Sequence, residues 1–448
     1  MKTKKYRTSK KKTYVILCCE ILLITTLVAG IALYAYSAVA KEKNAVKEPE
    51  TTAGMQTVKK PENDKGSSLA EKIHADGSVE ETLSKEAPAE AISSEGEASG
   101  ADQEEGETKE KHPLYTYDQG VKWFEPKNEE GVVLAFAGDI LFDDEYSVMV
   151  SIESRQGKIY DSISADLLEE MTGADIFMLN NEFTYTSRGD PLLEKQFTFR
   201  ADPETSKYLL DMGVDIVSIA NNHTYDYGEI SLLDTVATLA GMEMPYVGAG
   251  RNIEEASRPF FFETDGLKIG FLSATQIERL ENPDTKGATA DSPGVFRCWD
   301  GTLLYEKTKE VAEECDFLVV YVHWGSENTD ELDWSQKDQA LKLAQSGADL
   351  IIGDHSHCLQ GIDVIEGVPV FYSLGNFLFS SKTLDTCLVK AVIEDGRISK
   401  LQFLPAIQQG CRTQLLSGEE KARVIEYMRS ISNNVQIDPE GYITYGTD

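Results

Sequence analysis

The sequence predicts an α/β domain over residues 123–408, preceded by a membrane-spanning helix and a linker. Apolar, strand-like runs alternate with helix-like stretches after residue 131. A long apolar run follows a basic amino terminus, and the stretch between that run and the domain is polar. Continuous apolar strands that alternate with helices are typical of sheets covered on both faces.

The amino terminus predicts a membrane anchor. Residues 1–13 form a basic tail, and residues 14–36 are almost wholly apolar, long enough for the about 20 residues that span a bilayer. The positive-inside rule keeps the basic tail in the cytoplasm and puts the remainder outside. We therefore expect a single-pass protein of the cell membrane with an extracytoplasmic carboxyl-terminal domain. A cleaved signal peptide is the alternative, because residues 38–40 (AVA) resemble a cleavage site.

The segments on either side of the domain differ in character. Residues 37–122 are acidic, rich in Glu, Ala, Ser, Gly and Lys, and have no apolar period. Such a segment cannot offset its ordering entropy by burial, so we expect a disordered linker. Residues 409–448 contain a surface helix, with Ser417 as the N-cap and Glu420 three residues later, and we expect a helical appendage.

The net charge of -33 limits the classes of partner. Residues 1–40 carry +6 and residues 41–110 carry -9, which leaves -30 for residues 111–448. Such acidity excludes bulk electrostatic binding to nucleic acid, whose phosphates would be repelled. An anionic substrate would need a local cation, for which a metal ion is a candidate.

Five apolar runs are the expected strands, and five intervening stretches are the expected helices. The strands lie within residues 131–142, 174–183, 214–228, 315–325 and 348–357. The helices are expected at residues 163–171, 203–212, 230–241, 301–314 and 335–347. Open α/β sheets build their sites at the carboxyl ends of the strands, which is where the polar residues of this chain gather.

Four of the six histidines follow these strands: His223, His323, His355 and His357. Carboxylate and amide side chains accompany them at similar positions. Neutral imidazoles with such oxygens form the ligand set of a divalent Zn, Mn or Fe ion. The alternative is that each histidine caps a strand or packs in the core, which is usual for a single histidine but a poor account of four.

Residues 132–380 resemble the bacterial capsule-synthesis CapA family, the poly-gamma-glutamate capsule proteins. The resemblance rests on successive blocks, including AGDILF, NNEF, FRADPE, VHWGSE and GADLIIGDHSHCLQG. The combination of ANNHTYDYG with SLGNF is its most specific part. The family is similar in fold to the calcineurin-like metallophosphoesterases. The resemblance therefore implies a β-sandwich flanked by helices and a dinuclear metal centre.

Carried onto this chain, the resemblance implies a first metal position with four ligands: Glu182, Asn222, His323 and His355. One carboxylate and two imidazoles suit a divalent ion that keeps open positions for water and substrate. We expect one metal to bind here.

A second metal position is less complete. It would share Glu182 and add Asp139 and His357, but Leu141 stands where the related phosphoesterases have a histidine. Water or Asn181 would have to complete the ligand set. We therefore expect the second metal to bind weakly, if at all.

The resemblance also implies roles around the metal. His223 would be the general acid, with Asp226 orienting it, and the alternative for Asp226 is a turn residue. Arg200 would clamp a carboxylate or phosphate of the substrate, or else form a salt bridge within the acidic domain. Asn376 would line the substrate pocket.

The expected function is a role in synthesis, export or anchoring of an anionic capsule polymer, poly-gamma-glutamate by resemblance. The expected partners are that polymer or other envelope material, together with ligase or export subunits. A general metal-dependent phosphoesterase or amide hydrolase of the envelope is one rival. The other is a non-catalytic assembly subunit that kept the fold. The number of bound metal ions separates the two enzymes from the subunit, which would keep at most one metal.

Overall fold

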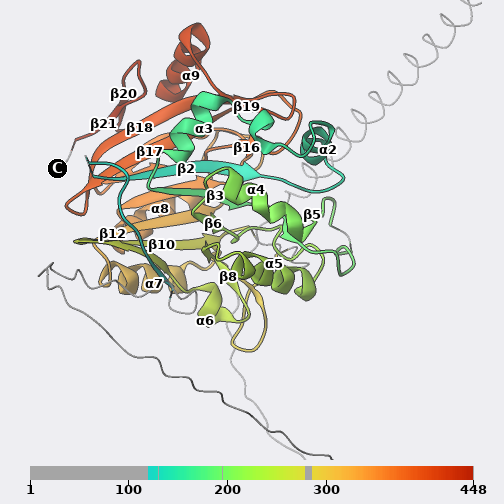
Figure 1. Cartoon of the computed structure of the whole chain (residues 1–448). Coiled ribbons are helices and arrows are strands. Elements are labelled where there is room, and N and C mark those ends of the chain that lie inside the picture. Colours follow the sequence, from blue (N-terminus) through green and yellow to red (C-terminus); the bar gives the residue numbers. More distant parts are fainter. Residues whose placement is uncertain (1–119, 130, 194, 278–284, 447–448) are drawn as a thin grey trace, which may run out of the picture. The chain divides into compact units, whose positions relative to one another are not determined.

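The computed structural model describes residues 120–129, 131–193, 195–277 and 285–446, and these form two large sheets with helices on their outer faces (Figure 1). The expected mixed α/β class is confirmed. The expected basic tail, anchor and nearly all of the linker lie outside the described residues. The expected linker extends too far along the chain, because residues 121 and 122 already lie in the first strand of the domain.

The first sheet has seven strands. In spatial order they are β1 (Val121–Trp123), β9 (Phe260–Thr264), β10 (Leu267–Thr275), β12 (Phe317–His323), β13 (Leu350–Asp354), β15 (Val368–Phe371) and β14 (Ile362–Ile365). Strands β10, β12, β13 and β15 run parallel. Strand β9 is antiparallel to β10 and parallel to β1, and β14 is antiparallel to β15. The carboxyl ends of the four parallel strands therefore meet at one edge of the sheet.

The second sheet has eight strands. In spatial order they are β19 (Thr413–Leu415), β18 (Arg397–Gln408), β17 (Leu384–Glu394), β2 (Val132–Ile140), β3 (Ile176–Asn181), β6 (Ile216–Ser218) and β7 (Tyr246–Val247), with β16 (Asn376–Leu378) paired to β2. Strands β2, β3, β6 and β7 are parallel. Strand β2 pairs on its other side with β17, antiparallel, so that Val132 lies opposite Ile393.

The helices and the short strands complete the domain. The α-helices are α2 (Ser147–Ser154), α3 (Ala165–Thr172), α4 (Lys207–Asp211), α5 (Glu229–Gly241), α6 (Ile253–Ala256), α7 (Thr302–Ala312), α8 (Trp334–Gln345) and α9 (Gly418–Ile431). Two 3₁₀ turns are η2 (Ile159–Ser162) and η3 (Pro203–Ser206), and short strand pairs are β4 (Thr184–Tyr185) with β5 (Arg200–Ala201), β8 (Ala249–Gly250) with β11 (Gly294–Val295), and β20 (Gln436–Ile437) with β21 (Ile443–Thr444). All five expected helical stretches contain a helix.

Strand β2 shows how the layers arise from the sequence. Leu134 and Phe136 pack with apolar residues of both large sheets, so the sheets face each other across one core. Their neighbours Ala135 and Ala137 point the other way, into a core shared with the helices beside the second sheet. A third core lies between the first sheet and helices α7 and α8. Because successive side chains of a strand alternate between faces, a strand buried on both faces is apolar throughout.

The helix starts follow local sequence signals. Helix α8 begins after Asp333, whose side chain accepts a bond from the backbone of Gln336 while the Gln336 side chain reaches back to Asp333. This reciprocal capping satisfies backbone donors that a helix start leaves free. Ser417 is the N-cap of α9, as expected, but its side chain makes no capping bond, and Glu420 pairs with Arg423 at 2.8 Å instead.

The carboxyl-terminal segment is packed more closely than the expected appendage. Strand β19 extends the second sheet, and α9 buries Val424, Ile425 and Met428 in the core between the sheets. Residues 409–446 therefore belong to the domain itself. The sequence did not predict this because the apolar stripe of α9 is narrow between its charged residues.

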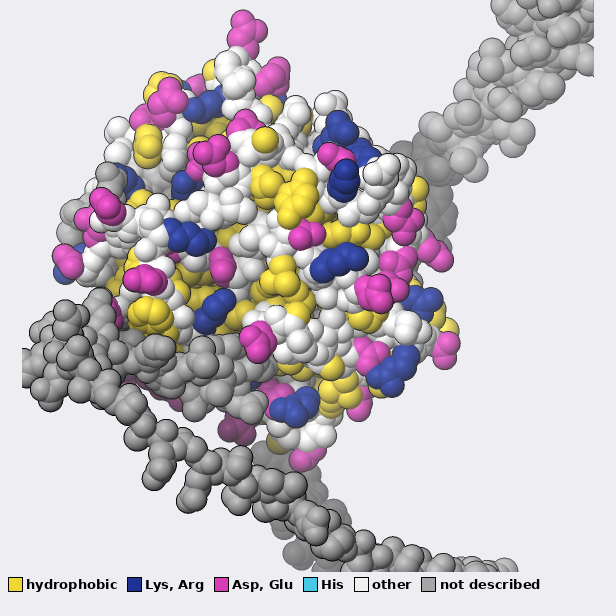
Figure 2. Space-filling view, in the orientation of Figure 1, with side chains coloured by type: hydrophobic (Ala, Val, Ile, Leu, Met, Phe, Trp, Pro, Cys, Tyr) yellow, Lys and Arg dark blue, Asp and Glu magenta, His cyan; other side chains and the backbone are white. Residues whose placement is uncertain are grey.

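The surface of the domain mixes charges of both signs. Figure 2 shows acidic and basic side chains interspersed over one face. Within the described part of the chain, no helix is both long enough and apolar enough to cross a membrane.

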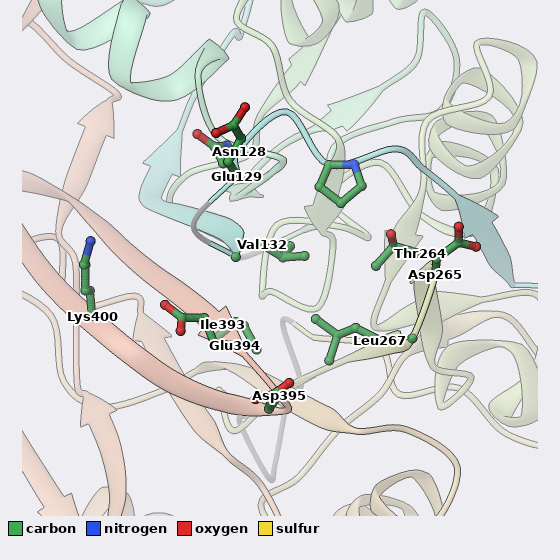
Figure 3. Close-up of a pocket in the computed structure, with 13 residues that line it drawn as sticks. Asn128, Glu129, Val132, Thr264, Asp265, Leu267, Ile393, Glu394, Asp395 and Lys400 are labelled. Carbon is green, nitrogen blue, oxygen red and sulfur yellow. The ribbon is translucent and has the colours of Figure 1, made fainter.

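A cavity of about 630 Å³ opens at the amino-terminal end of β2, beside the turns that precede β10 and follow β17 (Figure 3). It lies at the opposite end of these strands from the histidines.

Candidate metal centre

Strand ends from both large sheets bring the predicted metal ligands together. Asp139 lies near the end of β2, opposite Asn180 of β3, and Glu182 directly follows β3. His323 ends β12, opposite Asp354, which ends β13. The two sheets face each other, so their carboxyl-terminal edges meet and the polar residues form one buried cluster.

The four residues that the resemblance implies for a first metal position form a compact group around Nε2 of His323. This atom lies 2.8 Å from Oδ1 of Asn222, 3.0 Å from Nδ1 of His355 and 3.5 Å from Oε1 of Glu182. Glu182 and His323 are fully buried, and Asn222 and His355 nearly so. Four potential ligand atoms thus converge on one point. The convergence agrees with the predicted ligand set.

The second predicted group also assembles. Ligand atoms of Asp139, Glu182 and His357 lie within 4.8 Å of one another, and Nδ1 of His357 is 3.4 Å from Oδ2 of Asp139. Asn376 lies opposite Asp139 in the β16–β2 pair, with its Oδ1 2.9 Å from Nδ1 of His357. Leu141 is fully buried in the apolar core beneath the helices and supplies no ligand.

The chemistry of Glu182 tests whether a cation fits. Both of its side-chain oxygens are buried and have no hydrogen-bond partner among the described residues. Burial, and then the negative charges of Asp139 and Asp354, raise the pKa of Glu182 well above its usual value. An unpaired buried carboxylate is strongly disfavoured. A divalent cation between Glu182 and the imidazoles would remove this penalty, so the residues fit a metal.

The imidazoles are in the form that binds metals. Burial lowers the pKa of His323 to about 3. Burial, and then the neighbouring imidazoles, lower the pKa of His355 well below its usual value. Both rings are therefore neutral near pH 7, and a neutral imidazole nitrogen is a metal ligand.

Asp354 orients His323 and was missed by the sequence analysis. Its Oδ1 lies 2.8 Å from Nδ1 of His323, so Nδ1–H donates to the carboxylate and Nε2 is left for a metal. Its position beside the histidines at a strand end was a signal that could have identified it. Asn180 was missed too, and its Nδ2 donates to Oδ1 of Asp139 at 2.9 Å.

The loop after β13 aims both of its histidines at the cluster. His355 has a φ of 89° and His357 a φ of 57°. Non-glycine residues rarely adopt a positive φ, and such strain gathers at functional sites. The irregular backbone allows two histidines, two residues apart, to contact different parts of the centre.

His223 stands next to the metal positions. Its Nε2 is 4.0 Å from Oε1 of Glu182, and its Nδ1 is 2.7 Å from Oδ2 of Asp226. The ring packs on Phe199, with 4.3 Å between ring centroids. Asp226 also accepts a bond from the Phe199 backbone at 2.7 Å and pairs with Lys195. Asp226 therefore holds the His223 ring, and Lys195 is a further residue that the sequence did not suggest.

Charge changes beside His223 should move its pKa in opposite directions. Burial lowers this pKa, the Asp226 charge raises it, and the Lys195 charge lowers it. Asp226→Asn should therefore lower the pKa of His223 further, and Lys195→Met should raise it. Nuclear magnetic resonance titration of the His223 ring in the metal-loaded protein measures both, with Glu440→Gln, in the turn between β20 and β21, as the control. Equal shifts in the same direction would contradict the geometry.

Arg200 has no acidic side chain at salt-bridge distance among the described residues, so the expected salt bridge within the domain is not seen there. Its guanidinium lies over the ring of Tyr227, 4.6 Å from the centroid, in a cation–π contact. Its backbone N–H donates to Asp143 at 2.7 Å. Arg200 follows Phe199, which packs on His223, so it stands at the border of the centre. Substrate binding by Arg200 and by Asn376 stays a prediction.

Comparison with known proteins identifies the family. Residues 133–381 match the family described as bacterial capsule synthesis protein PGA_cap. The chain is 30% identical over 239 residues to the capsule biosynthesis protein CapA of Bacillus anthracis. The aligned region covers 52% of this chain and 57% of that protein. It is 30% identical over 218 residues to the PGA biosynthesis protein CapA of Bacillus subtilis, covering 47% and 56%. The chain thus spans little more than half of the length of these relatives.

A solved structure of a 5'-nucleotidase from Candida albicans is also similar, with 9% identity and a TM-score of 0.34 over 62% of this chain and 53% of that one. The family match covers more than half of the chain and includes every residue of the centre described above. The chain therefore belongs to the bacterial capsule synthesis protein family PGA_cap.

Proposed function

We propose that this chain is a membrane-anchored, extracytoplasmic protein of poly-gamma-glutamate capsule synthesis, export or anchoring that carries a metal-dependent hydrolytic centre. Family membership supports the link to the capsule. The names of the Bacillus relatives, a capsule biosynthesis protein and a PGA biosynthesis protein, point the same way. The basic tail and apolar run at residues 1–36 support the anchor.

One observation supports the metal-dependent part of the proposal most directly. Glu182 is a fully buried carboxylate with two unpartnered oxygens, and neutral His323 and His355 lie beside it. Among the described residues, no Lys or Arg side chain lies at salt-bridge distance from Glu182. The side chains at that distance are His223 and His323. A divalent ion beside this group would balance the buried carboxylate, and neutral imidazoles suit such an ion.

The arrangement resembles that of the calcineurin-like metallophosphoesterases. Two sheets pack face to face with helices outside, and strands from both supply the centre. A divalent cation in this place supplies Lewis-acid chemistry, since it activates water and polarises an acyl or phosphoryl oxygen. His223 can exchange a proton through Nε2, because Nδ1 is engaged by Asp226. Arg200 and Asn376 would contact an anionic substrate.

The second metal position is proposed to be the weaker one. Leu141 offers no ligand there, and the amide oxygen of Asn376 lies beside His357 instead. An amide oxygen binds a borderline metal less strongly than an imidazole does. Modest phosphoesterase activity, or hydrolysis of a different bond, follows from one well-held metal.

Metal analysis and turnover on two substrates test the proposed function. The purified chain is stripped of metal and titrated with Mn²⁺ or Zn²⁺ by calorimetry. It is then assayed with a chromogenic phosphodiester and with a gamma-glutamyl oligomer. We expect one tight metal-binding site and metal-dependent release of product from at least one of the two substrates. Binding without turnover would support an assembly subunit that retains its metal. Absence of binding would overturn the proposed centre.

The membrane topology gives a separate prediction. Protease added to wall-stripped intact cells should remove the domain after residue 123, because the positive-inside rule places it outside. Immunoblotting with an antibody against the α9 segment follows the loss, and a cytoplasmic protein serves as the control. Protection of the domain in intact cells, with cleavage only after lysis, would contradict the topology.

A further inference from the structure

A second cavity, of about 320 Å³, lies beside the candidate metal centre at the amino-terminal ends of α7 and α8. We call it the α7–α8 cavity, and its lining includes Gln276, Trp299, Asp300, Tyr305, Trp334 and Lys342. Gln276 follows β10, and its backbone N–H donates to the carbonyl of His323 at 2.9 Å. The cavity therefore shares a wall with the strand end that carries His323. Nothing in the proposed chemistry uses it.

The wall of this cavity holds a buried donor without a partner. Gln276 is only 3% exposed, and its Oε1 accepts a bond from Gly325 N–H at 3.4 Å. Its Nε2 is buried and has no hydrogen-bond partner among the described residues. A buried amide group left unpaired costs about 1–3 kcal/mol. A ligand oxygen that accepts from Nε2 after a small movement of the Gln276 side chain would remove this cost.

Two large aromatic side chains stand at the cavity with much of their surface in water. Trp334 is 75% exposed and Trp299 is 51% exposed. Trp334 begins α8, where a polar residue would serve the helix equally well, so its indole has no evident role in folding. Indole faces are large, rigid and apolar, with an N–H that hydrogen-bonds, so two of them beside one cavity suit the binding of a ligand ring.

The charges of the lining argue against an anionic ligand. Asp300 and Asp338 are both present, and Lys342 is the one cation among the described lining residues. Lys342 is already paired with Asp338 at 2.7 Å. An anionic chain would meet Asp300 with no cation available to balance it. A neutral ligand with hydroxyl groups would instead find carboxylate acceptors.

We propose that the α7–α8 cavity binds a sugar unit of a neutral saccharide. The C–H face of a pyranose ring packs on an indole face, a ring or hydroxyl oxygen accepts from Nε2 of Gln276, and hydroxyl groups donate to the carboxylates. The volume is within the range of small-ligand sites. This site neither uses the metal nor depends on the proposed hydrolytic function.

The test uses the full chain, purified in a detergent without a sugar headgroup. A neutral N-acetylglucosamine tetramer is titrated while tryptophan fluorescence and binding heat are recorded. We expect saturable binding that metal removal does not change. Trp334→Ala should weaken it about tenfold, the effect of losing one aromatic contact in a desolvated site. Tyr160→Ala, a half-exposed aromatic elsewhere on the domain, is the matched control and should leave it unchanged.

A second variant keeps the test decisive if one substitution disturbs folding. Gln276→Leu removes the buried donor and should also weaken the tetramer, with thermal melting as the check on folding. Binding that is absent at millimolar tetramer, or equal in Trp334→Ala and Tyr160→Ala, would overturn the proposal. So would cavity-dependent binding of a gamma-glutamyl oligomer in place of the saccharide.

Discussion

His323→Ala should lower the affinity of the protein for a divalent metal by about 100-fold or more. The ligand atoms of Asn222, His355 and Glu182 converge on Nε2 of His323. The substitution therefore removes the central ligand of the first metal position. Calorimetric titration of the metal-free protein with Zn²⁺ measures the change. A metal that binds only the folded state also raises its stability, so the metal-induced rise in melting temperature should vanish in the variant.

The control is His112→Ala, which removes a histidine of the expected linker that is not among the predicted ligands and should leave metal affinity unchanged. Asp354→Asn should have an intermediate effect, because it keeps the shape but weakens the acceptor that fixes the His323 ring at 2.8 Å. Loss of an outer partner of this kind costs about 10- to 100-fold in affinity. Wild-type affinity in His323→Ala would refute the first metal position.

Gly138→Ala should destabilise the domain and displace Asp139 from the centre. A Cβ at residue 138 would lie 1.9 Å from the carbonyl oxygen of Gly375, where no atom can be accommodated without movement of the backbone. The same carbonyl accepts the N–H of Asp139 at 3.2 Å. Separating the two backbones should cost about 3 kcal/mol in the free energy of unfolding. Urea denaturation measures this cost, and metal titration measures the displacement of Asp139.

Gly241→Ala is the matched glycine control. Residue 241 ends α5, and a Cβ there would meet no atom within 4 Å. Alanine should stabilise the helix end by about 0.5–1 kcal/mol relative to glycine. The two substitutions should therefore shift the urea midpoint in opposite directions. A Gly138→Ala protein with an unchanged midpoint would show that the contact with Gly375 does not constrain β2.

The sequence carried enough information for the class of fold and for most of the centre. Strand β2 is apolar from Val132 to Ala137, and Asp139 stands near its carboxyl end, so a run buried on both faces led directly to a polar strand end. The same reasoning located Glu182, His323 and His355. It worked because the carboxyl ends of parallel strands share an edge, so that position in the sequence translates into position in space.

Other features depend on contacts between distant segments and could not be predicted in this way. Lys195 lies in a loop without periodicity and gains its role only where the fold brings it to Asp226. Helix α9 has the sequence of a surface helix, and its burial arises because a neighbouring sheet covers its narrow apolar stripe. Asn376 reaches Asp139 through the β16–β2 pairing, which no short-range pattern encodes.

The pairing of β2 with β17 has a consequence for how the protein is made. Strand β2 is near the start of the domain, but the partner that covers one of its edges is among the last strands to be synthesised. The sheet therefore cannot close until almost the whole domain has left the ribosome, and pairings so distant in sequence form slowly. A growing chain would remain loosely structured for most of its synthesis, the state in which a polypeptide can thread through a narrow export channel. Any chain that stops before residue 384 would leave a long, apolar strand edge open, ready to pair with another copy.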